Sequence, residues 1–210
     1  AGFGPGMNKA FPQEWIDGQF DNSYENMGKE NSYIYYGPHW AQAGTAPSRI
    51  FKGFSTEGGL KVPGIINFKG KSDALKGQLS HQFMTVLDLA PTFMDLAGAE
   101  PFKGPYKGKE VHQHIGTSIM PYLKGETDKI HKEAETVVWE LHGRIAVRKG
   151  DWKLIKLPAN FGTGDWELFN VKNDPGETME LSVEMPDKLH ELKQEWQQYV
   201  EDNGVILPSD

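Results

Sequence analysis

The stretch TVVWELHGRIAVRKGDWKLIKLPANFGTGDWELFNV, residues 136–171, decides the fold of the second half of the chain. It contains four short runs that are rich in β-branched and aromatic residues, namely TVVWEL, GRIAVRKG, DWKLIKLP and WELFNV, with turn-forming residues between them. Runs of this composition and spacing are typical of strands that pair antiparallel with their neighbours. The stretch therefore predicts a four-stranded antiparallel meander.

The segment that follows the meander predicts a helix. After a turn built from NDPGE, residues 173–177, Pro186 stands at the expected first helical turn and Gly204 at the expected C-cap. Between them, apolar residues recur at helical spacing and form one stripe. We expect this helix to cover one face of the sheet. The stripe consists of Leu189, Leu192, Trp196, Tyr199 and Val200.

The spacing of apolar residues in the first half of the chain differs from that in the second half, and the change lies near residue 100. Residues 59–68, GLKVPGIINF, have the composition of a buried strand in which Pro63 marks a bulge or an edge. Residues 83–97 show helical spacing, with a kink or restart at Pro91 and a stop at Gly98. Residues 1–49 show no sustained period, so they are either a functional loop region or a piece of a larger domain.

Composition limits the classes of function. The chain has 210 residues, 38% of them hydrophobic, with a net charge of −7 and no cysteine. An acidic protein of this kind is a poor partner for nucleic acid, and the absence of cysteine rules out disulfides and thiolate chemistry. No apolar run approaches the ~20 residues needed to cross a bilayer, and the chain does not begin like a signal peptide. We therefore expect neither a nucleic-acid partner nor a membrane partner.

Two neighbouring stretches hold candidate site residues. Lys52 stands between aromatic residues and close to glycines in IFKGFSTEGG, residues 50–59, where it is either an anion-binding point charge or a solvated loop lysine. The stretch TAPSR, residues 45–49, looks like a nucleophile motif, but no base stands beside Thr45. We therefore interpret Arg49 as a structural arginine after a turn.

The remaining polar and aromatic candidates favour structural roles. Asp21 and Asn22 offer oxygens to a divalent cation, but no second acidic cluster lies near them, so a turn or cap is the preferred interpretation. His112 and His114 have the spacing of a metal pair on a strand but lack a third ligand. We expect structural or surface roles for His39, His81 and His142, and core packing for Trp139, Trp152, Trp166 and Trp196.

Four stretches in this order carry a resemblance to a known family. They are residues 31–68, residues 81–99, residues 143–158 and residues 166–182, and the most specific part is the Lys52 block with Thr56-Glu57-Gly58-Gly59 before a Val-Pro pair. Together they resemble the C-terminal portion of a sulfatase of the bacterial arylsulfatase type. The resemblance implies an α/β class, a partial alkaline-phosphatase-like domain over 1–103, followed over 104–210 by a small α+β domain with a four-stranded antiparallel sheet and a C-terminal helix.

The resemblance also implies a chemistry and assigns one residue. Such sulfatases are sulfuric ester hydrolases that use a formylglycine nucleophile beside a Ca²⁺ ion, and Lys52 matches the catalytic lysine that contacts the substrate sulfate. The nucleophile motif and the metal ligands would precede residue 1, so we expect this chain to carry no metal or cofactor. TAPSR cannot replace the motif, because oxidation of the Thr45 carbinol gives a ketone and not an aldehyde.

These implications define the expected partners and leave alternatives open. The partners are a sulfate ester, aryl or small alkyl, and the missing N-terminal half of the enzyme, without which we expect no hydrolysis. Export to the periplasm or secretion is a family expectation. The alternatives are a segment of a phosphonate or phosphodiester hydrolase, or a non-catalytic module that complements an N-terminal half through an exposed apolar face at residues 59–68.

Overall fold

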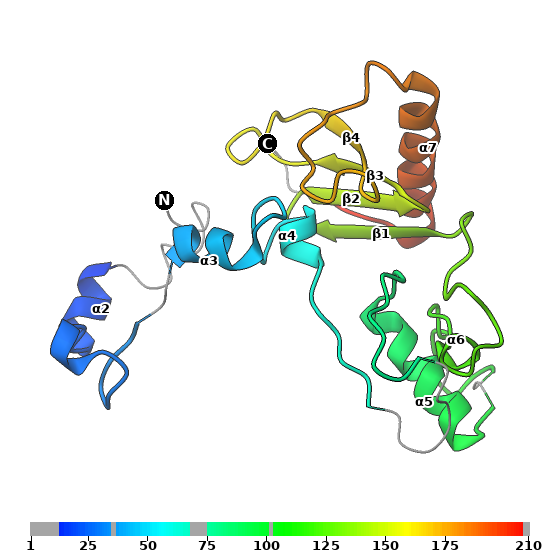
Figure 1. The fold of residues 1–210 in the computed structure, drawn as a ribbon, viewed down its shortest axis with the longest axis horizontal. Helices are drawn as coiled ribbons and strands as arrows, with labels where there is room; N and C mark the ends of the chain where they lie inside the picture. Colours follow the sequence, from blue (N-terminus) through cyan, green and yellow to red (C-terminus); the bar gives the residue numbers. More distant parts are fainter. Residues whose placement is uncertain (1–12, 35–36, 68–74, 101–102, 208–210) are drawn as a thin grey trace. The chain divides into compact units, whose positions relative to one another are not determined.

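The computed structural model describes residues 13–34, 37–67, 75–100 and 103–207 (Figure 1). Contacts divide the chain into two compact units. The first, the sheet unit, combines Ala1–Val62 with Thr136–Asp210, and the second, the helical unit, is Pro63–Glu135. The boundary predicted between residues 103 and 104 concerns the domains of a longer enzyme and stays a prediction.

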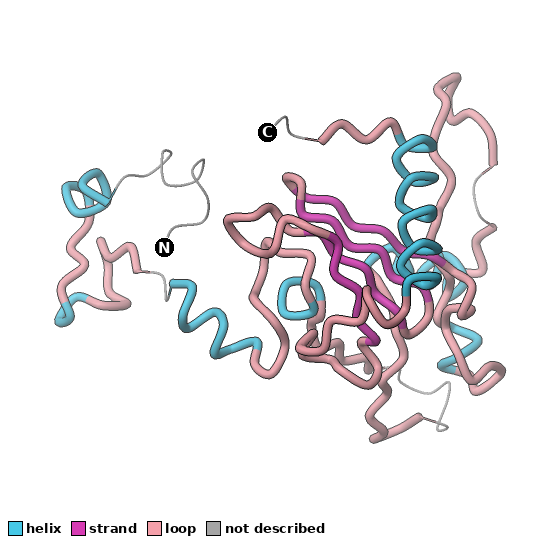
Figure 2. Tube along the Cα trace, turned by 90° about the horizontal axis from the view of Figure 1, so that it is seen from above, coloured by secondary structure: helices cyan, strands magenta, loops and turns pink. Residues whose placement is uncertain are grey.

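The sheet unit contains the predicted meander. Strands β1 (Thr136–Leu141), β2 (Arg144–Lys149), β3 (Trp152–Lys156) and β4 (Trp166–Asn170) pair antiparallel in the order of the sequence. The four strands lie side by side in Figure 2. The first two hairpins have two-residue loops with positive φ, at His142 and Gly143 and again at Gly150, which is the geometry that matches strand twist. These local turns fix the register, and the predicted four-stranded sheet is confirmed.

The first face of the sheet is covered by α7 (Pro186–Asn203), the predicted C-terminal helix. Pro186 occupies the first turn, and Gly204 ends the helix in the left-handed conformation, with φ of 59°. Leu192 and Trp196 are buried against alternate strand residues, and Lys149 of β2 pairs with Glu195 at 2.5 Å. The strand residues in this core are Ile145, Val147, Leu154 and Leu168.

The second face of the sheet has a smaller apolar core. Ala146, Ile155 and Phe169 are buried there with Val171. Two partly buried side chains pack against this core: Leu60 from α4 (Glu57–Leu60) and Trp139 from β1. The same face holds the fully buried ammonium group of Lys153, because side chains alternate along a strand. The packing roles predicted for the four tryptophans are confirmed: Trp196 is buried, and Trp139, Trp152 and Trp166 pack against the two cores.

The N-terminal part contains helices that the sequence pattern did not predict. They are α2 (Gln13–Gln19), the 3₁₀ turn η1 (Tyr24–Asn26) and α3 (Gly37–Thr45). Each is short, and glycines stand inside α2 and at the start of α3, so neither has the sustained apolar period that predicts a helix.

The prediction of a buried strand at residues 59–68 is wrong for the described part of this chain. Gly59 and Leu60 belong to α4, and residues 61–67 lie outside helices and strands, while residue 68 is outside the described residues. The side chains of Val62, Ile65 and Ile66 are 79%, 97% and 51% exposed. A strand needs a neighbouring backbone for its hydrogen bonds, and no strand pairs with this segment among the described residues.

The helical unit is built from η2 (Val86–Asp88), α5 (Leu89–Ala97) and α6 (Met120–Leu123). Helix α5 confirms the predicted helix and its restart near Pro91, which lies in the first turn, where backbone N–H groups have no intrahelical partner. Gly98 ends the helix with φ of 63°, as predicted.

A buried carboxylate connects three segments of the helical unit. Asp88 is fully buried and accepts hydrogen bonds from the backbone N–H groups of Thr85 at 2.6 Å and Thr117 at 2.8 Å. The ring of His131 lies 2.9 Å from Asp88 through Nε2 and 2.6 Å from Glu135 through Nδ1. Burial alone would raise the pKa of Asp88 and lower the pKa of His131, but these contacts outweigh burial, so the pKa of Asp88 is lowered and that of His131 is raised.

This arrangement predicts that His131 makes the helical unit more stable at lower pH. Since its folded pKa is raised, its contribution is complete below the unfolded value of about 6.5 and is lost as the pH rises through the folded value. Between about pH 6 and pH 9 we expect the opening free energy of α5, measured by amide hydrogen exchange, to fall further in the wild type than in His131→Gln. Equal pH dependence in both proteins would contradict this assignment.

Candidate functional site

The candidate site is the segment 49–60, called here the Lys52 loop, which begins four residues after the end of α3 and ends with α4. A hydrogen bond from Phe54 N to Phe51 O, 3.3 Å long, closes a turn with Lys52 and Gly53 at its two central positions. Gly53 has φ of 97°, the conformation that a type II turn requires at its third residue and that favours glycine. The turn places Lys52 at an exposed corner.

Downstream of the turn, the Lys52 loop folds tightly on itself. Phe54, Ser55, Thr56 and Glu57 are buried. A Cβ atom at Gly58 would lie 2.1 Å from the carbonyl oxygen of Ile50, so only glycine fits there. The same holds at Gly59, where a Cβ atom would lie 2.1 Å from the Phe54 carbonyl oxygen. The glycine pair of the TEGG motif thus serves this close backbone approach.

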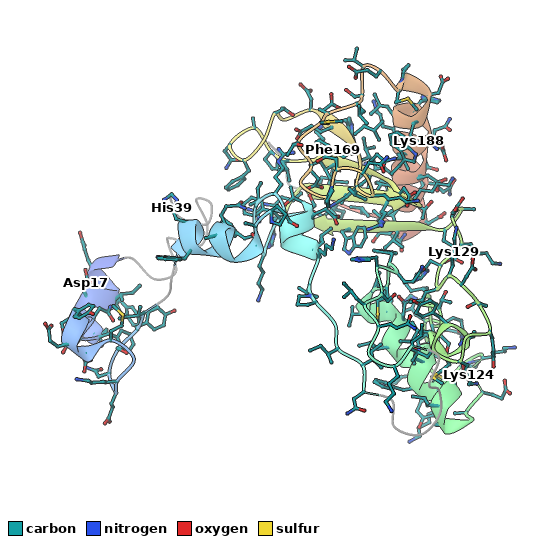
Figure 3. The ribbon with its side chains drawn as sticks, in the orientation of Figure 1. Asp17, His39, Lys124, Lys129, Phe169 and Lys188 are labelled. Carbon is teal, nitrogen blue, oxygen red and sulfur yellow. The ribbon has the colours of Figure 1, made fainter. Side chains whose placement is uncertain are left out.

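Arg49 anchors the first end of the Lys52 loop to β4. Its guanidinium group donates to both oxygens of Glu167, at 3.2 Å and 3.4 Å, and lies 5.8 Å from the ring centroid of Phe169, which Figure 3 labels on β4. Two parallel contacts of this kind fix the orientation of an arginine. The hydroxyl group of Thr45 donates a hydrogen bond to the backbone carbonyl oxygen of Ile50 at 2.7 Å. The interpretation of TAPSR as a turn leading to a structural arginine is confirmed.

Arg144, the first residue of β2, anchors the middle of the Lys52 loop. Its Nη1 donates to the carbonyl oxygen of Gly53 at 2.6 Å. Its guanidinium carbon lies 4.5 Å from the ring centroid of Phe54 and 4.8 Å from that of Phe161. Burial lowers the pKa of Arg144, but guanidinium groups stay charged in proteins.

A buried charge network, the Lys153 network, anchors the far end of the Lys52 loop. Lys153 donates to Oε1 of Glu57 at 2.9 Å. The same ammonium lies 2.9 Å from Oε1 of Glu177, outside hydrogen-bond geometry, so this second contact is one between charges. The other oxygen of Glu177 accepts the backbone N–H of Glu57 at 2.8 Å. Burial raises the pKa of Glu177, although Lys153 and the Glu57 amide act in the opposite direction.

The three anchors hold the Lys52 loop while the Lys52 side chain remains exposed. An exposed ammonium on a fixed turn is suited to binding an oxyanion as a point charge. The sequence predicted Lys52 but missed the anchoring residues of the sheet and the NDPGE turn. One signal was present, because Lys153 stands two residues before Ile155 on β3, so both side chains lie on the same face of the sheet, where Ile155 is part of the second core.

The other candidate residues have structural or surface positions. Asp21 accepts the backbone N–H of Ser23 at 3.0 Å, and Asn22 accepts that of Tyr33 at 2.8 Å, which confirms the predicted turn. The five remaining histidine candidates are exposed: His39 (labelled in Figure 3), His81, His112, His114 and His142.

The donor set for the Ca²⁺ ion that the resemblance implies does not occur in the described ranges. Within residues 13–34, 37–67, 75–100 and 103–207, no group of three or more His, Asp or Glu side chains could hold a metal ion. We therefore assign no chemical step to a metal here. Over the same ranges, no helix combines the length and the apolar character needed to cross a membrane.

Comparison with known families identifies the class of protein. Residues 49–203 match the family described as N-sulphoglucosamine sulphohydrolase, C-terminal, and the chain belongs to this family. The match begins at Arg49 and so contains the Lys52 loop and all of its anchors. The expectation that the chain is a C-terminal portion of a sulfatase is confirmed.

Individual relatives agree with this assignment. The chain is 40% identical over 194 residues to an uncharacterized sulfatase of Schizosaccharomyces pombe, covering 91% of this chain and 34% of that protein. It is 38% identical over 109 residues to an arylsulfatase of Klebsiella aerogenes, covering 51% of this chain and 22% of that protein. The chain thus spans about a third or less of the length of these curated relatives.

A solved structure resembles the chain in fold. The crystal structure of Ps i-CgsB superposes with a TM-score of 0.59 at 27% identity, covering 75% of this chain and 33% of that one. The same protein has also been solved in complex with k-i-k-neocarrahexaose.

Proposed function

We propose that this chain is the C-terminal part of a sulfuric ester hydrolase in which Lys52 binds an oxygen of the substrate sulfate. The observation that carries the proposal is the position of Lys52: it is the exposed corner of a turn that three buried or partly buried contacts fix, inside the segment that matches the sulfatase family. A lysine ammonium donates up to three hydrogen bonds and carries a full charge, which suits a sulfate group.

The role of Lys52 follows from the charge changes in sulfate ester cleavage. As the ester bond breaks, negative charge is distributed over the sulfate oxygens and the leaving oxygen. A cation that is already fixed in place stabilises this charge without reorganising during the reaction. The Lys52 loop meets that requirement for the backbone that carries the ammonium group, because its anchors are contacts within the protein and do not depend on bound substrate. In this proposal, the formylglycine nucleophile and the Ca²⁺ ion belong to the rest of the enzyme.

The rest of the enzyme is also the proposed partner of residues 61–67. Val62, Ile65 and Ile66 expose apolar side chains directly after the Lys52 loop. An exposed apolar stretch that belongs to no sheet is suited to pairing with the edge of another sheet. We propose that it joins the N-terminal part of the sulfatase, and that the 210-residue chain by itself has no hydrolase activity.

The experiment that tests the proposed reaction compares two ester classes with the complete enzyme. We expect hydrolysis of an aryl sulfate such as p-nitrophenyl sulfate, and a much lower kcat/KM for bis-p-nitrophenyl phosphate. Because Ps i-CgsB was solved with an oligosaccharide, a sulfated oligosaccharide is the second sulfate ester to assay. The 210-residue chain alone serves as the negative control. Hydrolysis of the phosphodiester without hydrolysis of any sulfate ester would favour the phosphorus-ester alternative.

A further inference from the structure

Of the three anchors of the Lys52 loop, Arg144 is the one whose contact partners lie nearest to Lys52 in the sequence. The carbonyl that it binds belongs to Gly53, the residue directly after Lys52 and the third residue of the turn. The ring that lies nearest to its guanidinium carbon belongs to Phe54, the fourth residue of the same turn. One side chain from β2 thus contacts the two residues that follow Lys52.

The contact is specific for arginine. The guanidinium carbon lies over the rings of both Phe54 and Phe161, as in a cation–π contact, while Nη1 donates to the carbonyl oxygen of Gly53. The two rings also contact each other edge to face, with centroids 5.0 Å apart. A lysine at this position would keep the charge but present a compact, more strongly hydrated cation to the two rings. The geometry therefore fixes the orientation of the peptide group between Gly53 and Phe54.

The hairpin loop before Arg144 sets where its side chain begins. His142 and Gly143 form the two-residue loop between β1 and β2, and Gly143 N donates to Oε1 of Glu140 at 2.8 Å. Arg144 is therefore the first residue of a rigid strand, directly opposite Leu141. The antiparallel sheet thereby supplies a fixed support for the turn that carries Lys52.

We propose that Arg144 is a positioning residue for catalysis: it holds the turn at residues 51–54 so that the Lys52 ammonium meets the substrate sulfate in one place. This inference rests on the proposed function of Lys52. Since small displacements of a catalytic group can cost as much as about 10²-fold in rate, we expect Arg144→Met to lower kcat/KM for the sulfate ester by about 10-fold or more.

A double-mutant cycle in the complete enzyme separates positioning from general stability. If Arg144 acts through Lys52, then Arg144→Met should have little further effect in a Lys52→Ala background, because the group that it positions is absent. Arg144→Lys should retain more activity than Arg144→Met but less than the wild type. The matched control is Lys149→Met on the same strand, whose ion pairs go to α7, and its kcat/KM should equal that of the wild type.

The outcomes distinguish this inference from the proposed function. An enzyme that cleaves no sulfate ester, or a fully active Lys52→Ala variant, contradicts the proposed function itself. If the wild type is active and Lys52→Ala is impaired, the proposed function stands. The positioning role alone is then overturned by a neutral Arg144→Met variant, or by losses in kcat/KM that multiply in the double variant. If the methionine variant does not fold, the same cycle with Arg144→Lys gives the answer, because this change keeps the charge and most of the length.

Discussion

Replacing Lys153 with methionine should lower the opening free energy of β3 and β4 by about 3–5 kcal/mol, as expected when one partner of a buried ion pair is removed. The Lys153 side chain is fully buried between Glu57 and Glu177, and Glu177 is itself fully enclosed. Methionine fills a similar volume but leaves two buried carboxylates without their cation. Amide hydrogen exchange on β3 and β4 in the complete enzyme measures the change.

Two comparisons test this explanation of the Lys153 variant. Lys149→Met removes ion pairs that are partly exposed and should cost no more than about 1 kcal/mol, so equal losses in the two variants would contradict it. The loss in Lys153→Met should also be smaller at low pH. Burial raises the pKa of Glu177, and Lys153 opposes this shift, so removing Lys153 raises the pKa of Glu177 further. A carboxyl group with a raised folded pKa destabilises the fold least when it is protonated.

Replacing Lys52 with alanine should lower kcat/KM for a sulfate ester by about 10²–10³-fold, the effect of removing one fixed donor from developing negative charge. Lys52 is exposed and its neighbours are held by other residues, so the fold should be unchanged. Steady-state kinetics of the complete enzyme measure the loss. The matched control is Lys172→Ala, another exposed lysine of the sheet unit, which pairs with Asp151 at 3.1 Å on the surface. If both variants keep wild-type kcat/KM, then Lys52 is a solvated loop lysine.

The parts of the fold that could be predicted from the sequence depend on local interactions. The hairpins of residues 136–156 are joined by two-residue loops with positive φ, and α7 has proline at its start and glycine at its end, so neighbouring residues fix each element. The predicted strand at residues 59–68 was wrong for the opposite reason. Its composition favours a strand, but forming one requires a neighbouring strand, and within the described residues none pairs with it.

The residues of the candidate site also divide into those that could be predicted from the sequence and those that could not. Lys52 could be singled out because aromatic residues and glycines surround it in the sequence and because it matches the lysine of the family that the chain resembles, while its role in binding sulfate stays a prediction. Its anchors could not, because Arg144 lies 91 residues from Gly53 and Lys153 lies 96 residues from Glu57. Only the folded meander brings them to the Lys52 loop. A lysine among the core-facing residues of β3 was the one local sign that a buried carboxylate partner existed.

The most direct test of the role of Lys52 is a crystal structure of the complete enzyme with a sulfate ester bound. We expect the Lys52 Nζ atom to lie within hydrogen-bond distance, about 2.7–3.2 Å, of a sulfate oxygen, with the Gly53 carbonyl still bound to Arg144. A sulfate group held elsewhere, with Lys52 directed to solvent, would contradict it.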